Sequence, residues 1–249
     1  MRSVRPCLPV VLLLALFMVG CSTSGITETN PGQHPIVYTK EYKKTVSTNC
    51  LFYLPKDYGK EKKQWPLVLF LHGAGERGSD ISLVSKHGPP MLASEGKDLP
   101  FILISPQCPE NLYWGMDSEI EILDALLKDV QSNYDVDPNR IYITGLSMGG
   151  FGTWEMLARY PNRFAAAIPI CGGGDSTKAY IFKDVPIWVF HGAKDNIVPL
   201  SQSQSMVNAL KACGGNPKFT IYPNAEHNSW AETYNNPEVF DWLLKQSKK

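Results

Sequence analysis

The sequence predicts an α/β fold in which a mostly parallel central sheet is covered by helices on both faces. Three observations favour this class. Short apolar runs alternate with segments of helical periodicity along most of the 249 residues. The runs are apolar along their whole length, as in strands that are buried on both faces. Hydrophobic residues make up 43% of the chain and charged residues 19%, which suits one globular domain with a substantial core.

Seven segments are predicted to be strands because they are short, apolar and rich in β-branched or aromatic residues. They are Val46 to Leu54, Leu67 to Leu71, Phe101 to Ser105, Ile141 to Thr144, Ala165 to Ile170, Ile187 to Phe190 and Phe219 to Tyr222. Only Cys171 to Val185 separates the fifth strand from the sixth, so a large lid domain does not fit there. Sheets of this kind bind ligands beyond the carboxyl ends of their strands. Functional residues are therefore expected just after strands.

Helices are predicted between most of these strands. The clearest runs from Glu119 to about Tyr134, and Ser118 with Glu121 is expected to form a capping box at its start. A second helix is predicted over Leu200 to Ala212, where two glycines follow, and a last one over Glu238 to Lys245.

The N-terminus is predicted to be a targeting segment that is not part of the fold. Residues 1–20 combine two early arginines with an apolar run too short to span a bilayer, which takes about 20 residues. Met18-Val19-Gly20-Cys21 resembles the bacterial lipobox, so we expect lipidation of Cys21 and attachment to a membrane surface facing the periplasm or the outside; ordinary secretion is the alternative. Residues 21–36 are predicted to be a flexible tether and residues 37–249 the folded domain.

Charge and cysteine content narrow the function classes. The 24 lysines and arginines balance the 24 aspartates and glutamates, so no overall field favours nucleic acid. In an oxidising compartment, Cys50, Cys108, Cys171 and Cys213 have three possible full pairings, and buried free thiols are the alternative. None of them has the spacing of metal ligands, so no metal site is expected. The sequence leaves the oligomeric state open.

A candidate nucleophile follows the fourth predicted strand. Gly145-Leu146-Ser147-Met148-Gly149 places a serine between glycines, after a β-branched run and before residues at helical spacing. This is the strand, turn and helix order of a nucleophile elbow, in which the serine hydroxyl is exposed at the end of a sheet. A neutral hydroxyl is a poor nucleophile, so Ser147 needs a base that removes its proton.

An acid and a histidine follow two later strands. Asp195 comes after the sixth predicted strand and His227 after the seventh. Histidine takes up and returns protons around neutral pH, and an aspartate holds its ring in the correct tautomer. The sequence therefore predicts a catalytic triad of Ser147, Asp195 and His227. Asp175, one strand earlier, is the alternative acid.

The loop after the second predicted strand, His72-Gly73-Ala74-Gly75, is predicted to help stabilise an oxyanion. Its small residues let backbone amides approach a ligand, and the amides of Ala74 and Met148 are the expected donors. His72 and His191 each precede a glycine at a strand end, and because histidines at such positions brace the loop in similar sequences, both are expected to do so here.

Five motifs resemble those of the α/β-hydrolases. They are LFLHGAGERG, SPQCPEN, VDPNRIYITGLSMGGFGTW, VFHGAKDNIVP and AEHNSW. Together they are similar to a secreted esterase branch related to dienelactone hydrolase, phospholipase/carboxylesterase and feruloyl or acetyl xylan-type sequences. The resemblance extends from about Val37 to the C-terminus. It implies an α/β-hydrolase fold, no cofactor, and a site made of Ser147, Asp195, His227 and the amides of Ala74 and Met148.

Substrate preference is the least defined expectation. Trp114 and Trp230 are predicted to contact substrate, whereas Phe151 is expected to pack in the core. An open site suits small esters and esters carried on polysaccharides, such as feruloyl or acetyl groups. The expected function is an exported serine carboxylic-ester hydrolase that works through an acyl-enzyme. The alternatives are a serine peptidase of the prolyl-oligopeptidase-like group and a non-catalytic, glycan-binding surface lipoprotein.

Overall fold

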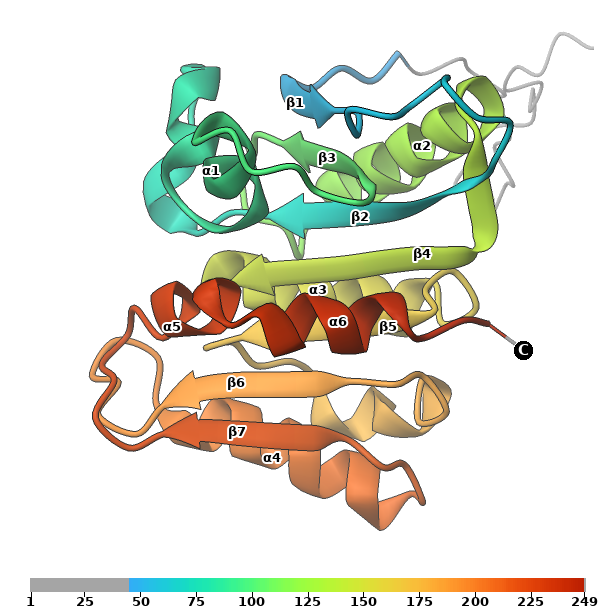
Figure 1. Ribbon diagram of the computed structural model, residues 1–249. Coiled ribbons are helices and arrows are strands. Elements are labelled where there is room, and N and C mark those ends of the chain that lie inside the picture. The colour runs from blue at the N-terminus through green and yellow to red at the C-terminus, as the bar shows by residue number, and fades with distance from the viewer. Residues whose placement is uncertain (1–44, 249) are drawn as a thin grey trace, which may run out of the picture. The chain divides into compact units, whose positions relative to one another are not determined.

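Seven strands form one sheet in the order β1-β3-β2-β4-β5-β6-β7 (Figure 1). The computed structural model describes residues 45–248, so the predicted signal segment, tether and lipidated Cys21 lie outside the described residues. β1 pairs antiparallel with β3, and all other pairs are parallel. The strands are β1 (Cys50–Tyr53), β2 (Trp65–Leu71), β3 (Ile102–Pro106), β4 (Val136–Leu146), β5 (Ala166–Ile170), β6 (Trp188–Gly192) and β7 (Lys218–Tyr222).

Every predicted strand is present, and the predicted fold class is confirmed. β4 is longer than expected because it begins at Val136, which pairs with Trp65 at the start of β2. β1 is shorter than expected, since only the four residues Cys50–Tyr53 pair with β3 at the edge of the sheet.

Helices cover both faces of the sheet. α1 (Gly88–Ser94), α5 (Trp230–Asn235) and α6 (Pro237–Leu244) lie on one face, and α2 (Asp117–Asn133), α3 (Met148–Arg159) and α4 (Leu200–Ala212) on the other (Figure 1). Three short 3-10 helices are η1 (Ala74–Glu76), η2 (Ile81–Lys86) and η3 (Ser176–Ile181). Alternate residues of β2 point to opposite faces of the sheet. Leu69 packs in the hydrophobic core under α2, α3 and α4, and Phe70 packs in the core under α1, α5 and α6.

The capping box predicted at the start of α2 is wrong. The helix begins at Asp117, and its N-cap is Met116, which makes no side-chain cap. The Met116 carbonyl oxygen accepts hydrogen bonds from the amides of Glu119 and Ile120 at 3.0 Å. Ser118 is therefore already inside the first turn, where its hydroxyl faces the Glu119 carboxylate at 3.5 Å.

The connection between β5 and β6 contains η3 and no lid domain, as predicted. Cys50, Cys108, Cys171 and Cys213 are all free, so the free-thiol alternative holds for the described cysteines. Across residues 45–248, no helix has both the length and the apolar character needed to cross a bilayer.

Candidate active site

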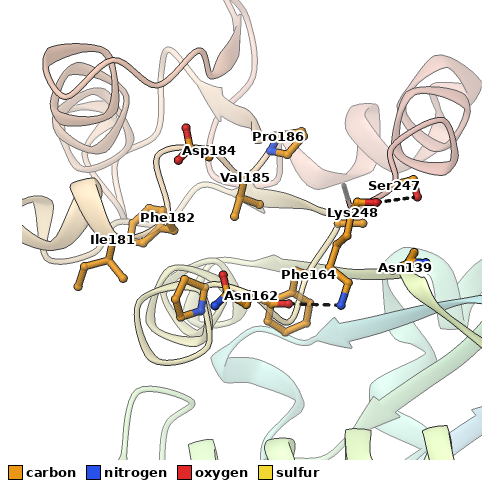
Figure 2. Close-up of a pocket in the computed structure, with 12 residues that line it drawn as sticks. Asn139, Asn162, Phe164, Ile181, Phe182, Asp184, Val185, Pro186, Ser247 and Lys248 are labelled. Carbon is orange, nitrogen blue, oxygen red and sulfur yellow. Dashed lines mark hydrogen bonds between the residues drawn. The ribbon is translucent and has the colours of Figure 1, made fainter.

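Cavities lie at both ends of the parallel strands. One, of about 740 Å³, lies at the amino ends of β5 and β6, and its lining includes Phe164, Val185 and Lys248 (Figure 2). The Lys248 ammonium donates a hydrogen bond to the Asn162 carbonyl oxygen at 3.3 Å, and none of the described residues that line this cavity is a histidine. A second cavity, of about 500 Å³, lies beyond the carboxyl ends of the strands and is lined in part by Ser147. This second cavity is the candidate site.

The turn between β4 and α3 holds Ser147 in a strained backbone conformation. Its φ of 50° and ψ of −116° lie outside the regions that L residues ordinarily adopt. Two glycines let the chain turn this tightly. A Cβ on Gly145 would lie 2.3 Å from the Gly149 oxygen, and one on Gly149 would lie 1.9 Å from the Leu71 oxygen. The turn therefore presents the Ser147 hydroxyl at the start of α3, as a nucleophile elbow requires.

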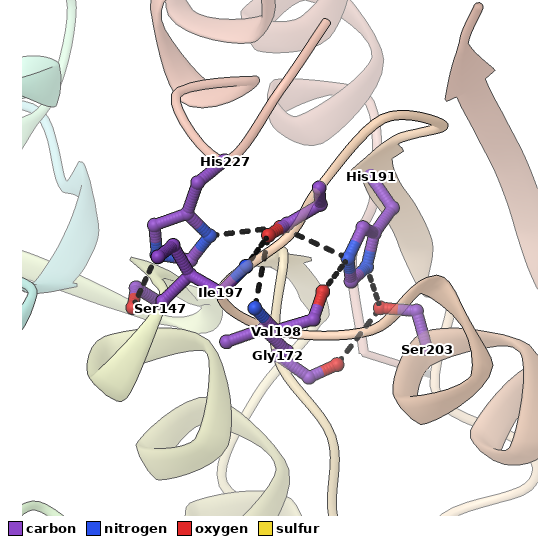
Figure 3. Close-up of polar contacts among 8 residues, drawn as sticks. Ser147, Gly172, His191, Ile197, Val198, Ser203 and His227 are labelled. Atoms are coloured by element: carbon purple, nitrogen blue, oxygen red, sulfur yellow. Dashed lines mark hydrogen bonds and ion pairs between the residues drawn. The ribbon is translucent and has the colours of Figure 1, made fainter.

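Three side chains from separate loops form one hydrogen-bonded chain (Figure 3). Nε2 of His227, between β7 and α5, lies 2.9 Å from Oγ of Ser147, and Nδ1 lies 2.8 Å from Oδ2 of Asp195. Since a carboxylate only accepts, Nδ1 carries a proton, and in a neutral ring Nε2 then accepts from the serine hydroxyl. This is the tautomer that a general base needs. The structure thus brings the three predicted residues together, while their catalytic roles stay a prediction.

Asp195 is buried, and hydrogen-bond donors surround it. Oδ1 accepts from the amides of Ile197 and Val198, each at 2.9 Å. The side chain has no exposed surface. Burial raises the pKa of Asp195, but the hydrogen bonds from His227 and from the two amides outweigh this effect and hold the pKa below its usual value. Asp195 is therefore ionised at neutral pH, and the stability that its contacts provide is lost only as the pH falls through that lowered pKa.

His72 braces the loop that follows β2. Its buried ring places Nδ1 2.6 Å from the Gly73 carbonyl oxygen, and Nε2 accepts from the Cys108 amide at 3.0 Å. One nitrogen donates and the other accepts, so the ring is neutral. Burial lowers the pKa of His72 to about 4, although the hydrogen bond to Gly73 opposes this shift. The contacts agree with the predicted bracing role.

Acid is expected to destabilise the protein through His72. Because the pKa of His72 is lowered to about 4 in the folded state, the unfolded chain binds more protons between pH 6.5 and 4. The free energy of unfolding should therefore fall by about 3 kcal/mol across this window from His72 alone. Urea unfolding at pH 7, 5.5 and 4 measures it, with His72→Asn as the matched variant. The variant should start less stable and lose less on acidification; equal losses in the two proteins would contradict the assignment.

The predicted oxyanion donors lie at two helix starts. Ala74 is the first residue of η1, separated from the end of β2 by His72 and Gly73, and Met148 is the first residue of α3. Within residues 45–248, the amides of Ala74 and Met148 donate no hydrogen bond to a protein acceptor, so both are free to bind a ligand. A Cβ on Gly73 would lie 2.8 Å from Cδ1 of Leu146, which shows that this loop packs closely against the end of β4. Their role in oxyanion binding stays a prediction.

Trp114 does not face the cavity, so the prediction that it binds substrate is wrong. Its side chain is only 1% exposed, and its indole nitrogen donates to the His72 carbonyl oxygen at 3.0 Å. The Trp114 ring packs edge-on against the His72 ring, with centroids 5.1 Å apart. Gly152 of α3 makes room for it, because a Cβ there would lie 2.4 Å from the Trp114 Cβ. Trp114 therefore supports the loop that carries Ala74 from inside the core.

Trp230 lies against the histidine of the site. It is the first residue of α5, and its ring meets that of His227 at 89° with centroids 5.2 Å apart. The ring of His87 also lies against Trp230, with centroids 5.5 Å apart. Trp230 is not among the residues that line the cavity with Ser147. Its contacts hold the His227 ring in place, and its predicted contact with substrate stays a prediction.

The aromatic lining of the cavity comes from other residues. Phe151, expected in the core, is 37% exposed, Tyr113 is 55% exposed, and both line the cavity with Ser147. The expectation for Phe151 is therefore wrong. Glu155 also lines the cavity. Ser147, Phe151 and Glu155 follow one another at i, i+4 and i+8, which places them on one side of α3. This spacing is the sequence signal that identifies the lining residues.

His191 makes a contact that its predicted bracing role did not include. Its Nε2 lies 3.2 Å from Oδ2 of Asp195, the same oxygen that His227 contacts (Figure 3). The i, i+4 spacing of His191 and Asp195 around the end of β6 is the only sequence signal for this contact. Asp175, the alternative acid, is exposed, and its Oδ1 accepts from the Thr177 amide at 3.0 Å to cap η3. Asp195 is therefore the acid that contacts His227.

A metal does not fit the donors present. One ligand atom each of Cys171, Asp195 and His227 lies within 4.8 Å of the other two. Burial raises the pKa of Cys171 to about 12, so its sulfur is a thiol at neutral pH and not the thiolate that metals bind. Asp195 and His227 are already hydrogen-bonded to each other. We therefore assign the three groups no metal.

Comparison with known proteins points to one family. The model described as the Dienelactone hydrolase family matches residues 106–240, more than half of the chain and the part that contains Ser147, Asp195 and His227. A crystal structure of a thermostable esterase superposes with a TM-score of 0.72 at 37% identity, covering 84% of this chain and 62% of that one.

Two curated relatives are more distant. A bifunctional acetylxylan esterase/xylanase of Neocallimastix patriciarum is 24% identical over 65% of this chain, which is 24% of its own length. A carboxylesterase of Arabidopsis thaliana is 26% identical over 64% of this chain and 82% of its own. The chain spans at most 24% of the first three curated relatives that it matches.

Proposed function

The chain belongs to the dienelactone hydrolase family, and on that premise we propose that it hydrolyses carboxylic esters with Ser147 as nucleophile. The observation that carries the proposal is the continuous chain of hydrogen bonds from Asp195 through His227 to Ser147, with links of 2.8 and 2.9 Å. These hydrogen bonds end at the Ser147 hydroxyl, which a strained turn exposes to a cavity.

The first half of the reaction forms an acyl-enzyme. Nε2 of His227 removes the hydroxyl proton as Oγ of Ser147 bonds to the ester carbonyl carbon. The carbonyl oxygen becomes an oxyanion, which the amides of Ala74 and Met148 receive; one such donor contributes about two to three powers of ten in kcat. Asp195 stabilises the imidazolium of His227. The tetrahedral intermediate then expels the alcohol, which takes the proton from Nε2, and leaves the acyl group on Oγ.

The second half repeats these steps with water. Nε2 of His227 takes a proton from a water molecule, whose oxygen adds to the acyl carbon at the same oxyanion site. Collapse of the intermediate breaks the bond to Oγ of Ser147, and the proton on Nε2 returns to the serine. The products are the free acid and the alcohol, and no cofactor enters either half.

We place esters carried on polysaccharides first among the substrates, with feruloyl or acetyl groups as the acyl part. No lid covers the cavity among the described residues, and Tyr113 and Phe151 offer aromatic faces that suit an aryl ring or a sugar. The acetylxylan esterase/xylanase among the relatives supports the same substrate class.

The substrate proposal is tested by comparing feruloyl, acetyl, lipid and peptide substrates side by side. Feruloyl esters should give the highest kcat/KM, because their ring can stack on Phe151. Phe151→Ala should lower kcat/KM for a feruloyl ester about two- to tenfold, the value of one aromatic contact, and leave that for an acetyl ester of the same alcohol nearly unchanged. Equal losses on both esters would contradict the stacking role. Hydrolysis of the peptide alone would favour the peptidase alternative.

We also propose export and lipid attachment at Cys21, which rest on the sequence alone. The short apolar run before Met18-Val19-Gly20-Cys21 and the polar tether after it support this proposal. Replacing Cys21 with alanine should move the protein from the membrane fraction to the soluble fraction after cell lysis. Cys50→Ala, which changes a described free cysteine, should leave the distribution unchanged. Membrane association of the Cys21→Ala protein would rule out this anchor.

A further inference from the structure

The reaction described above makes no use of His191. This residue lies in β6, and its side chain has no exposed surface. Nδ1 lies 2.8 Å from Oγ of Ser203, and Nε2 lies 2.9 Å from the Val198 carbonyl oxygen and 3.2 Å from Oδ2 of Asp195 (Figure 3). Both ring nitrogens therefore have oxygen partners, and the positions of the hydrogens decide the charge of the ring.

Nδ1 of His191 must donate its hydrogen bond. Oγ of Ser203 lies 2.8 Å from the Gly172 carbonyl oxygen, which can only accept, so the single hydroxyl hydrogen of Ser203 points to Gly172. The Ser203 oxygen is then left as an acceptor for the histidine. A neutral ring with a bare Nδ1 would need Ser203 to turn its hydrogen away. Among the described residues, the buried Gly172 oxygen would then keep no donor, and a buried carbonyl without a donor is unfavourable.

Nε2 of His191 must donate as well. The Val198 carbonyl and the ionised Asp195 carboxylate are both acceptors. A ring with protons on both nitrogens is an imidazolium. The same accounting for His72 gives one donor and one acceptor, hence a neutral ring, and it agrees with the pKa of about 4 that burial gives His72.

The surrounding charges favour a cation at this position. Asp195 is a carboxylate with no exposed surface, and resting His227 is neutral as a base, so the acid otherwise lacks a positive partner. The titratable side chains nearby on the neighbouring chain segments are Cys171, which follows β5, and Tyr222 of β7. Burial raises the pKa of both, so both are neutral. From α4, the Ser203 hydroxyl contacts the ring.

We propose that His191 is a buried imidazolium and a positioning residue, which shares Asp195 with His227 and keeps His227 unprotonated in mildly acidic solution. Its positive charge offsets part of the carboxylate charge that would otherwise favour protonation of His227. The effect on catalysis rests on the proposed ester hydrolysis, whereas the protonation of His191 does not.

Nuclear magnetic resonance of the protein labelled with ring-15N histidine tests the protonation directly. The chain has five histidines, so His191 can be assigned from the signals that His191→Gln removes. At pH 7 both ring nitrogens of His191 should carry a proton. A single protonated nitrogen would overturn the proposal. If His191→Gln does not fold, Ser203→Ala provides the assignment, because it removes the partner of Nδ1 and should shift that signal most. This readout does not depend on any activity of the protein.

The pH profile of kcat/KM tests the consequence for catalysis. In His191→Gln, which keeps a side-chain N–H but loses the charge, the acid limb should move about one unit to higher pH. His34→Gln is the matched control that removes a histidine elsewhere in the chain, and its limb should coincide with that of the unmodified protein. An acid limb of His191→Gln that stays in place, or moves to lower pH, would overturn the positioning role.

Discussion

Replacing Ser147 with alanine is expected to lower kcat for ester hydrolysis by four to six powers of ten. The substitution removes the oxygen that forms the acyl-enzyme in this account, while Asp195 and His227 still hydrogen-bond to each other. Serine hydrolases that lose their nucleophile fall by about 10⁶ in kcat, and the amides of the oxyanion site account for the activity that remains.

Steady-state kinetics with an activated aryl ester measure this loss. Ser205→Ala is the matched control, because it removes the hydroxyl of an exposed serine on α4 and should leave kcat unchanged. The Ser147→Ala protein should unfold at the same urea concentration as the unmodified protein or a higher one, since the hydroxyl is not needed for the fold. A loss of kcat below tenfold would show that Ser147 is not the nucleophile.

Among substitutions of the described glycines by alanine, Gly149→Ala is expected to cause the largest loss of free energy of unfolding. A Cβ at this position would lie 1.9 Å from the Leu71 oxygen and 2.8 Å from the His72 oxygen, both of which are backbone atoms. The start of α3 would have to move away from β2, at a cost of about 4 kcal/mol or more, which lowers Tm by about 10 °C. The same movement displaces the loop that carries Ala74, so kcat should fall as well.

Thermal and urea unfolding check this expectation, with Gly75→Ala as the control. A Cβ on Gly75 meets no atom within 4 Å, so the control should change the free energy of unfolding by less than about 1 kcal/mol. Both variants change a glycine near the site to alanine, and only the space around the new methyl group differs. Equal destabilisation by the two would show that the close contact at Gly149 does not set the cost.

The sequence was sufficient to predict that Ser147, Asp195 and His227 meet at one site. Ser147, Asp195 and His227 each follow a different parallel strand, and the carboxyl ends of such strands lie at one edge of a sheet. Their convergence therefore required only the strand pattern and the short loops that follow it. The hydrogen bonds of 2.8 and 2.9 Å among them show how closely the side chains meet.

The direction of the aromatic side chains could not be predicted in the same way. Trp114 lies in a loop, where no periodicity indicates which way a side chain points. It packs into the core because Gly152 has no Cβ that would occupy the same space. Phe151 lies on a helix, but its apolar character favoured the core. Its spacing from Ser147 and Glu155 places it on the cavity side instead. Polarity alone does not distinguish a core ring from one that lines a cavity.

Contacts between distant segments were also beyond the sequence pattern. His191 meets Ser203 only because α4 packs beside β6, and Ser203 meets Gly172 only because β5 ends next to them. The start of α2 likewise depends on the Met116 carbonyl and not on the Ser118 capping box. In each case the deciding partner comes from the packed structure, which a local motif does not contain.

Covalent labelling with a fluorophosphonate tests the central assignment most directly, because this reagent phosphonylates only a serine that a neighbouring base activates. The account predicts one adduct per chain, on the peptide that contains Ser147, and no adduct in the Ser147→Ala protein. Labelling of Ser147→Ala at the rate of the unmodified protein, or an adduct on a different residue, would contradict it.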